Sequence, residues 1–138
     1  MQNVTRKLRD FFASSSPPGV VAVYLFGSST RRAHRESDVD IGILLDRGLY
    51  AKRSLRGRMR IVLIADLIHA LSKNEVDVVI LNDAPPELAK HVATQGVPVL
   101  INNREENHAF VRDAQLRAAD IAPFLARMRR LKLEYATR

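Results

Sequence analysis

The sequence predicts an α/β fold in which a small mixed β-sheet is flanked by helices. Short apolar runs rich in β-branched residues alternate with longer segments whose apolar residues recur at helical spacing. Clusters of Pro, Gly, Ser and Asn separate these segments, as turns separate strands from helices. The 138 residues are 46% hydrophobic and contain no cysteine, so a packed core is expected without disulfides or thiolate-bound metal.

Four segments have the composition of β-strands. The run at 20–26 is apolar on both faces, which is typical of a central strand. Pro98 cannot donate to a strand ladder, so the last run is expected at a sheet edge. The predicted strands are 20–26, 39–45, 75–81 and 97–101.

Four segments show helical periodicity, and the third begins after two prolines with Glu87 in its first turn. Pro123 is expected to bend or divide the last segment. The predicted helices are 4–13, 52–71, 87–95 and 104–135. In the second, five apolar residues are expected on one side: Leu55, Met59, Val62, Leu63 and Leu67. We expect one domain over 1–138, with a core of about 1–103 and a C-terminal helical segment of about 104–138.

The charge is uneven along the chain. The formal net charge is +7, and residues 31–60 alone carry nine basic and four acidic side chains. Such a field would attract nucleoside triphosphates, nucleic acid or an acidic protein, although solvated helix faces explain it as well. The sequence shows neither a signal peptide nor an apolar run of membrane-spanning length, so a cytoplasmic location is expected.

Two aspartates stand at the start of the second apolar run. Alternate residues of a strand point to the same face, so Asp38 and Asp40 are expected to place their carboxylates side by side. Like charges held that close repel unless a cation neutralises them. Hard carboxylate oxygens suit Mg²⁺, and a pair of Mg²⁺ ions about 4 Å apart is the usual device for nucleotidyl transfer. The pair therefore predicts a magnesium site.

Two other elements could complete this site. Asp77 lies near the start of the third apolar run, where it is either a third metal ligand or a solvated strand-end residue, with Glu75 as the fallback ligand. Gly27 and Ser28 follow the first strand directly. A glycine there lets the backbone approach phosphate oxygens, although most such pairs are ordinary turns.

Three separated motifs together resemble the signature of the DNA polymerase β nucleotidyltransferase superfamily. They are 25–28 (Leu-Phe-Gly-Ser), 37–41 (Ser-Asp-Val-Asp-Ile) and 76–79 (Val-Asp-Val-Val). The stretch 76–86 with 96–100 is similar to the minimal nucleotidyltransferases in particular. The chain departs from many relatives in loop 29–37, which is shorter and lacks a glycine.

The resemblance implies a polymerase β-like fold and a role for each motif. Gly27 and Ser28 would bind the triphosphate of ATP, Asp38 and Asp40 would bind Mg²⁺, and Asp77 would complete the metal site and help deprotonate the attacking hydroxyl. Many relatives are antitoxins that transfer AMP from ATP to a tyrosine of a HEPN ribonuclease toxin. A hetero-oligomer with such a toxin is therefore expected, without a membrane or nucleic acid as direct ligand.

Two alternatives remain open from the sequence. The chain could transfer a nucleotide to a hydroxyl of a small molecule, as aminoglycoside-modifying relatives do. It could also be an antitoxin that acts by binding alone, although the presence of Asp38, Asp40 and Asp77 together favours catalysis.

Overall fold

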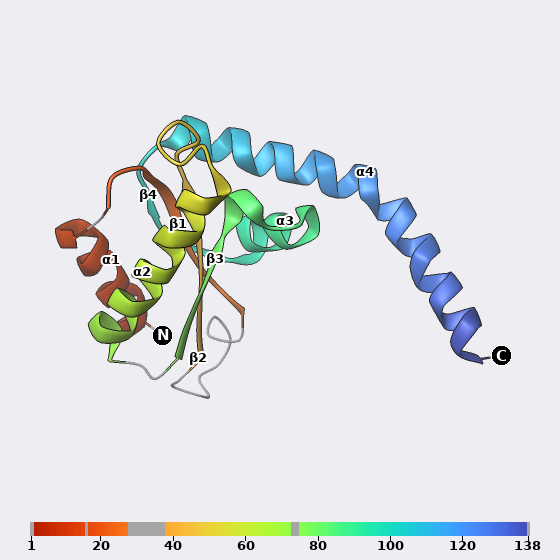
Figure 1. Ribbon diagram of the computed structural model, residues 1–138, viewed down its shortest axis with the longest axis horizontal. Helices are drawn as coiled ribbons and strands as arrows, with labels where there is room; N and C mark the ends of the chain where they lie inside the picture. The colour runs from red at the N-terminus through yellow and green to blue at the C-terminus, as the bar shows by residue number, and fades with distance from the viewer. Residues whose placement is uncertain (1, 16, 28–37, 73–74, 138) are drawn as a thin grey trace.

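A four-stranded mixed sheet forms the centre of the molecule (Figure 1). The computed structural model describes residues 2–15, 17–27, 38–72 and 75–137. The sheet order is β3-β2-β1-β4. The strands are β1 (Val20–Phe26), β2 (Asp38–Leu45), β3 (Glu75–Ile80) and β4 (Val97–Ile101). β1 pairs antiparallel with both β2 and β4, whereas β2 and β3 run parallel, as expected of strands joined by a crossover helix.

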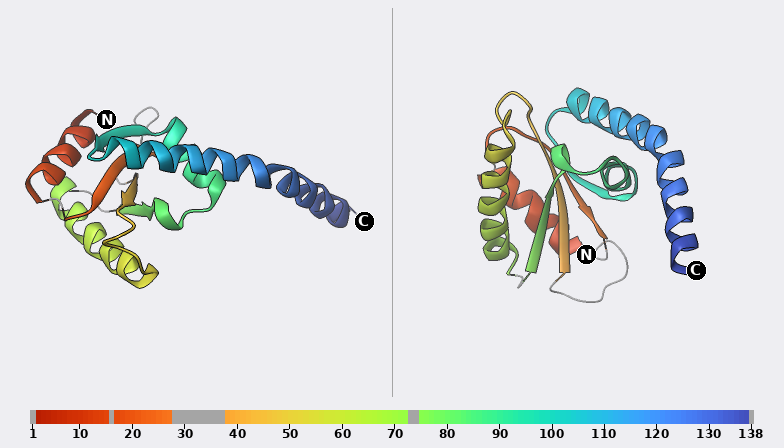
Figure 2. Two further views of the ribbon diagram at one scale, coloured as in Figure 1. Left: turned by 90° about the horizontal axis from the view of Figure 1, so that it is seen from above. Right: turned by 45° about the vertical axis from the view of Figure 1, so that its right-hand side comes forward.

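Helices cover both faces of this sheet (Figures 1 and 2). The helices are α1 (Gln2–Ser15), α2 (Arg53–Leu71), the short 3₁₀ helix η2 (Leu81–Asp83), α3 (Pro86–Gln95) and α4 (Arg104–Thr137). α1 and α2 pack on one face, while α3 and the first half of α4 pack on the other. The α/β class and the C-terminal helical segment predicted from the sequence are confirmed.

The two faces of the sheet differ in what they bury. Alternate residues of the strands, among them Leu25, Ile41 and Val78, join α1 and α2 in the main hydrophobic core. The other face has a smaller apolar cluster around Tyr24, and its phenol donates a 2.8 Å hydrogen bond to Asn107 Oδ1 of α4. Because strand side chains alternate, residues that open β2 and β3 on this second face lie outside the main core.

The predicted apolar side of α2 was partly wrong. The buried residues are Leu63, Leu67 and Leu71, whereas Leu55 and Val62 are exposed. α2 lies over β3 at the edge of the sheet and beside α1. Only a narrow row of its side chains, spaced four residues apart, is therefore fully buried. The sequence alone does not indicate that this helix covers an edge strand.

The final helix is continuous through Pro123, and Figure 1 shows that it bends along its length. Proline removes one helical N–H donor and crowds the carbonyl four residues earlier, which bends a helix. The predicted bend is confirmed, and the predicted division is not. Among the helices of the described residues, none is long and apolar enough to cross a membrane.

Candidate functional site

The polar residues that the sequence predicts to form a site lie at one end of the sheet. The end of β1 lies there beside the starts of β2 and β3, because β1 runs antiparallel to β2 and β3 runs parallel to it. In the strand register, Asp40 is paired with Phe26 on one side and with Asp77 on the other. Paired residues of neighbouring strands lie about 5 Å apart and point to the same face. Two carboxylates far apart in the sequence are therefore neighbours.

Gly27 lies directly against the carboxylate of Asp40. Its φ angle is +77°, which side-chain-bearing residues rarely adopt. A Cβ atom at this position would collide with Oδ2 of Asp40. The glycine is therefore required both by the backbone turn after β1 and by the close approach of Asp40.

Asp77 is exposed at the edge of the sheet and pairs with an arginine of α2. Arg60 Nη2 lies 3.2 Å from Asp77 Oδ1, and the two side chains are 44% and 57% exposed. The same guanidinium donates through Nε to the carbonyl oxygen of Val78 at 2.6 Å. Arg60 thus binds the edge strand and holds Asp77. The sequence analysis missed this residue, since seventeen positions separate it from Asp77 and only the packing of α2 on β3 brings them together.

Asp38 and Ser28 are the two predicted site residues whose side chains the structure does not describe. Asp38 opens β2, where its backbone is in register with Glu75. The side chain of Asp38 and the whole of Ser28 lie outside the described residues, as does loop 29–37. Their parts in the site remain predictions. Within the described part of the chain, no group of three or more carboxylate or imidazole side chains is arranged as a metal site.

The residues that are described fit Mg²⁺ by their chemistry. Asp40 and Asp77 provide hard oxygen donors on one face of the sheet, which is the ligand type that Mg²⁺ takes. Gly27 places no side chain of its own beside the carboxylate of Asp40. This arrangement suits a phosphate group approaching the backbone.

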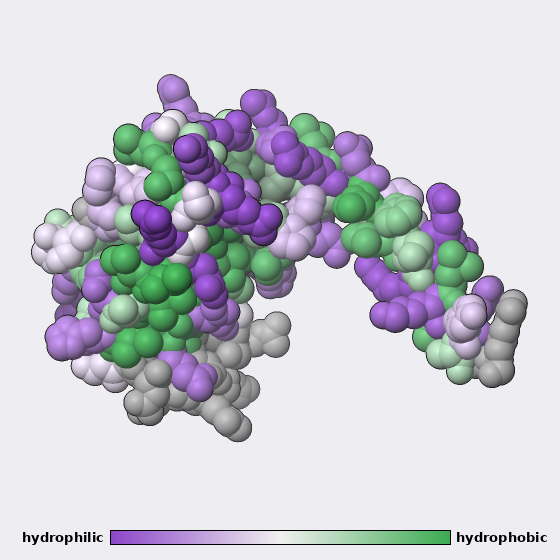
Figure 3. All heavy atoms as spheres, in the orientation of Figure 1, coloured by the Kyte–Doolittle hydropathy of each residue, from purple (hydrophilic) through white to green (hydrophobic). Residues whose placement is uncertain are grey.

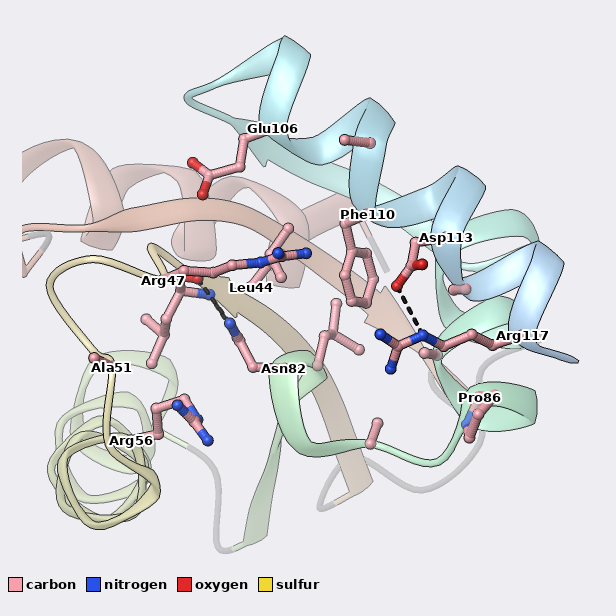
Figure 4. Close-up of a pocket in the computed structure, with 16 residues that line it drawn as sticks. Leu44, Arg47, Ala51, Arg56, Asn82, Pro86, Glu106, Phe110, Asp113 and Arg117 are labelled. Atoms are coloured by element: carbon pink, nitrogen blue, oxygen red, sulfur yellow. Dashed lines mark hydrogen bonds and ion pairs between the residues drawn. The ribbon is translucent and has the colours of Figure 1, made fainter.

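A separate cavity lies at the opposite end of the sheet (Figure 4). Its volume is about 570 Å³, and it lies between α4, the end of β2 and the start of α2. Leu45, which lines it, is five residues from Asp40 along β2, or about 15 Å. Arg47, Arg56 and Arg117 line this cavity with Phe110. It contains none of the predicted site residues, so it is not the predicted site.

Several polar groups around that far cavity form hydrogen bonds or ion pairs within the fold. Arg56 forms a bidentate pair with Asp83, at 2.8 Å from Nη2 to Oδ1 and 3.0 Å from Nε to Oδ2. These hydrogen bonds with Asp83 raise the pKa of Arg56 above its usual value. Asn82 accepts from the Leu45 amide at 2.9 Å and donates to the Leu45 carbonyl at 2.8 Å. The polar residues here are explained by the packing of the fold.

The comparison with protein families decides the class of the chain. The model of the polymerase β nucleotidyltransferase family, described as "Polymerase beta, Nucleotidyltransferase", matches residues 6–105. The chain belongs to this family. The match includes β1, β2 and β3 with the edge that holds Gly27, Asp40 and Asp77. The family predicted from the three motifs is confirmed.

Solved structures show the same fold over almost the whole chain. A chain of the toxin–antitoxin complex MntA–HpeT, in a variant with two Asp→Glu substitutions, is 23% identical with a TM-score of 0.65, covering 97% of this chain and 98% of that one. A toxin–antitoxin structure with AMP-PNP is 24% identical with a TM-score of 0.64, covering 97% and 98%. A complex of tri-AMPylated HEPN toxin with MNT antitoxin from Shewanella oneidensis is 23% identical with a TM-score of 0.63, covering 99% and 98%. Among curated proteins, none matches this sequence.

Proposed function

We propose that this nucleotidyltransferase is an antitoxin that transfers AMP from ATP to a tyrosine hydroxyl of a HEPN ribonuclease toxin, with Mg²⁺ as cofactor. The observation that carries the proposal is the register of Asp40 with Asp77 beside Gly27 on a nucleotidyltransferase fold. Like charges directly opposite in a sheet destabilise it, so their presence favours a function over a structural role.

The solved relatives support the choice of substrate and partner. Their names include a toxin–antitoxin pair, a complex with the ATP analogue AMP-PNP and an AMPylated HEPN toxin. In the MntA–HpeT variant, glutamate replaces two aspartates that lie two positions apart, which is the spacing of Asp38 and Asp40 here. We transfer these properties to this chain as part of the proposal.

In the proposed reaction the tyrosine oxygen attacks the α-phosphorus of ATP. The new oxygen–phosphorus bond forms as the bond to the β-phosphate breaks, and pyrophosphate leaves. Asp77 accepts the proton of the hydroxyl, and Gly27 and Ser28 bind the triphosphate through the turn after β1. Asp38, Asp40 and Asp77 would hold Mg²⁺, which neutralises the developing phosphate charge when it is bound.

The test is incubation with a HEPN-type toxin, ATP and Mg²⁺, followed by intact mass measurement. We expect the partner to gain the mass of one or more AMP units. Asp40→Ala should reduce transfer by at least about 1,000-fold, because charge neutralisation at the phosphate is the main catalytic contribution in this chemistry. Chelation of the metal should have the same effect.

Three outcomes would contradict parts of this proposal. Retained transfer by folded Asp40→Ala would remove the assignment of the site. Neutralisation of the toxin without added mass would identify an antitoxin that acts by binding alone. Transfer to a small-molecule hydroxyl, with the partner left unmodified, would identify the second alternative.

A further inference from the structure

The second half of α4 extends away from the rest of the molecule (Figures 1 and 2). α3 and α4 together line a surface hollow that reaches Ala122. Beyond this point nearly every described side chain of the helix is exposed. We call residues 121–135 of α4 the arm. An isolated helical segment of this length is marginal in water, so a partner that covers it would contribute to its stability.

The arm carries an apolar stripe that continues the buried face of the same helix. Ala114 is buried, and Ile121, Met128 and Tyr135 follow it at intervals of seven residues, which returns each to the same face. Phe124, Leu125 and Leu131 flank this row. The exposed fractions are 53% for Phe124, 48% for Met128, 52% for Leu131 and 83% for Tyr135. A helix face built for packing is thus left uncovered within the described chain.

Figure 3 shows hydrophobic side chains gathered along this arm, with a hollow between the arm and the main body. The stripe continues the face of α4 that packs on α3 and β1. Figures 1 and 2 show the arm descending beside α3 toward the level of the edge where β2 and β3 begin. An occupant of the hollow would therefore lie on the same side as the candidate site.

The charge of the arm decides what kind of occupant fits. Residues 121–135 contain four basic residues, Arg127, Arg129, Arg130 and Lys132, and one acidic residue, Glu134. None of these four cations forms an ion pair with another side chain that the structure describes. A second copy of this chain would bring two cationic arms together, which costs free energy.

We propose that the arm is the docking surface for a helical partner protein that presents an apolar groove with acidic side chains along its rim. This inference rests on the proposed function, because the partner is the protein that receives the nucleotide. The apolar stripe fills the groove, and the cations beside it pair with the rim. Docking on the arm would hold the partner beside α3, toward the end of the sheet where β2 and β3 begin (Figures 1 and 2).

The experiment compares two pairs of substitutions in the full-length chain. Phe124→Glu with Met128→Glu places charge on the stripe. The matched control is Leu116→Glu with Leu133→Glu. Leu116 lies two residues from buried Ala114, and Leu133 lies two residues from Leu131. Two residues along a helix turn to roughly the opposite side, so both leucines lie off the stripe. All four positions are exposed, so we expect folded proteins with unchanged melting temperatures.

Binding is measured by titration with the same HEPN-type toxin. The stripe variant should bind at least about thirty-fold more weakly, as expected when two anchoring side chains are lost, and the control should bind as the unmodified chain does. Lys132→Glu should weaken binding more than Arg130→Glu. Lys132 lies four residues after Met128 and beside the stripe, whereas Arg130 lies two residues after it and on the other side.

Several results would overturn the docking proposal. They are unchanged binding by the stripe variant, equal loss in the control, and an unmodified chain that does not bind this protein. Self-association abolished by the stripe variant would identify a second copy as occupant. Binding to phosphatidylglycerol vesicles that depends on the stripe would identify a membrane surface. Asp40→Ala separates this inference from the proposed function, because it should lose transfer and keep binding.

Discussion

Charged residues are paired differently at the two ends of the sheet. We call the end with the cavity the far end, and the end with Gly27, Asp40 and Asp77 the near end. At the far end, Arg56 and Asp83 form a mostly buried pair of opposite charges, with side chains 16% and 24% exposed. At the near end, Asp40 and Asp77 have the same charge and are paired in the strand register, and Arg60, which forms an ion pair with Asp77, is half exposed. The far end is arranged to stabilise the fold. In the proposed function, the near end holds a cation and a phosphate.

Gly27→Ala tests the near end with the largest expected effect on stability. We expect a loss of about 3 kcal/mol in the free energy of unfolding, since alanine is strained at a φ of +77° and its Cβ collides with the Asp40 carboxylate. Nucleotidyl transfer should also fall, because Asp40 is displaced. Chemical denaturation and the mass assay measure the two effects.

The matched control is Gly57→Ala in the middle of α2. A Cβ there meets no heavy atom within 4 Å, so the substitution should leave transfer unchanged and raise stability by about 0.5–1 kcal/mol through helix propensity. Equal stability of the two variants would mean that Asp40 does not depend on the glycine.

Arg56→Ala and Arg60→Ala compare the ion pairs of the two ends. Removing Arg56 leaves Asp83 without its bidentate partner in a mostly buried position, which should cost about 2 kcal/mol and leave nucleotidyl transfer unchanged. Removing Arg60 should cost less than about 1 kcal/mol, because its pair with Asp77 is exposed to solvent. Denaturation curves measure both. A larger loss for Arg60 would show that the edge of β3 depends on it for stability.

Asp40→Asn has the smallest expected effect on stability. It relieves the repulsion between Asp40 and Asp77 and keeps the shape of the side chain, so the melting temperature without Mg²⁺ should stay the same or rise slightly. Differential scanning calorimetry is the measurement. A substantial fall would assign Asp40 a structural role and remove the contrast between the two ends.

Much of the fold could be predicted because its signals are local. The apolar run of β1, the proline at the edge strand β4 and the proline at the start of α3 each act on neighbouring residues. The apolar side of α2 could not be predicted in the same way. Whether Val62 is buried depends on how far α2 overlaps the edge strand β3. The spacing of apolar residues within α2 does not indicate the extent of this overlap.

The candidate site, like the fold, could be predicted from the sequence only in part. The sequence by itself determined that Gly27, Asp40 and Asp77 stand near the ends of apolar runs, because glycine and aspartate are depleted within strands. Only the tertiary structure decided that Asp40 and Asp77 are register partners, that Gly27 makes room for one of these carboxylates, and that Arg60 contacts the other. These relations join residues far apart in the chain, and they exist only once the sheet has formed and α2 has packed on its edge.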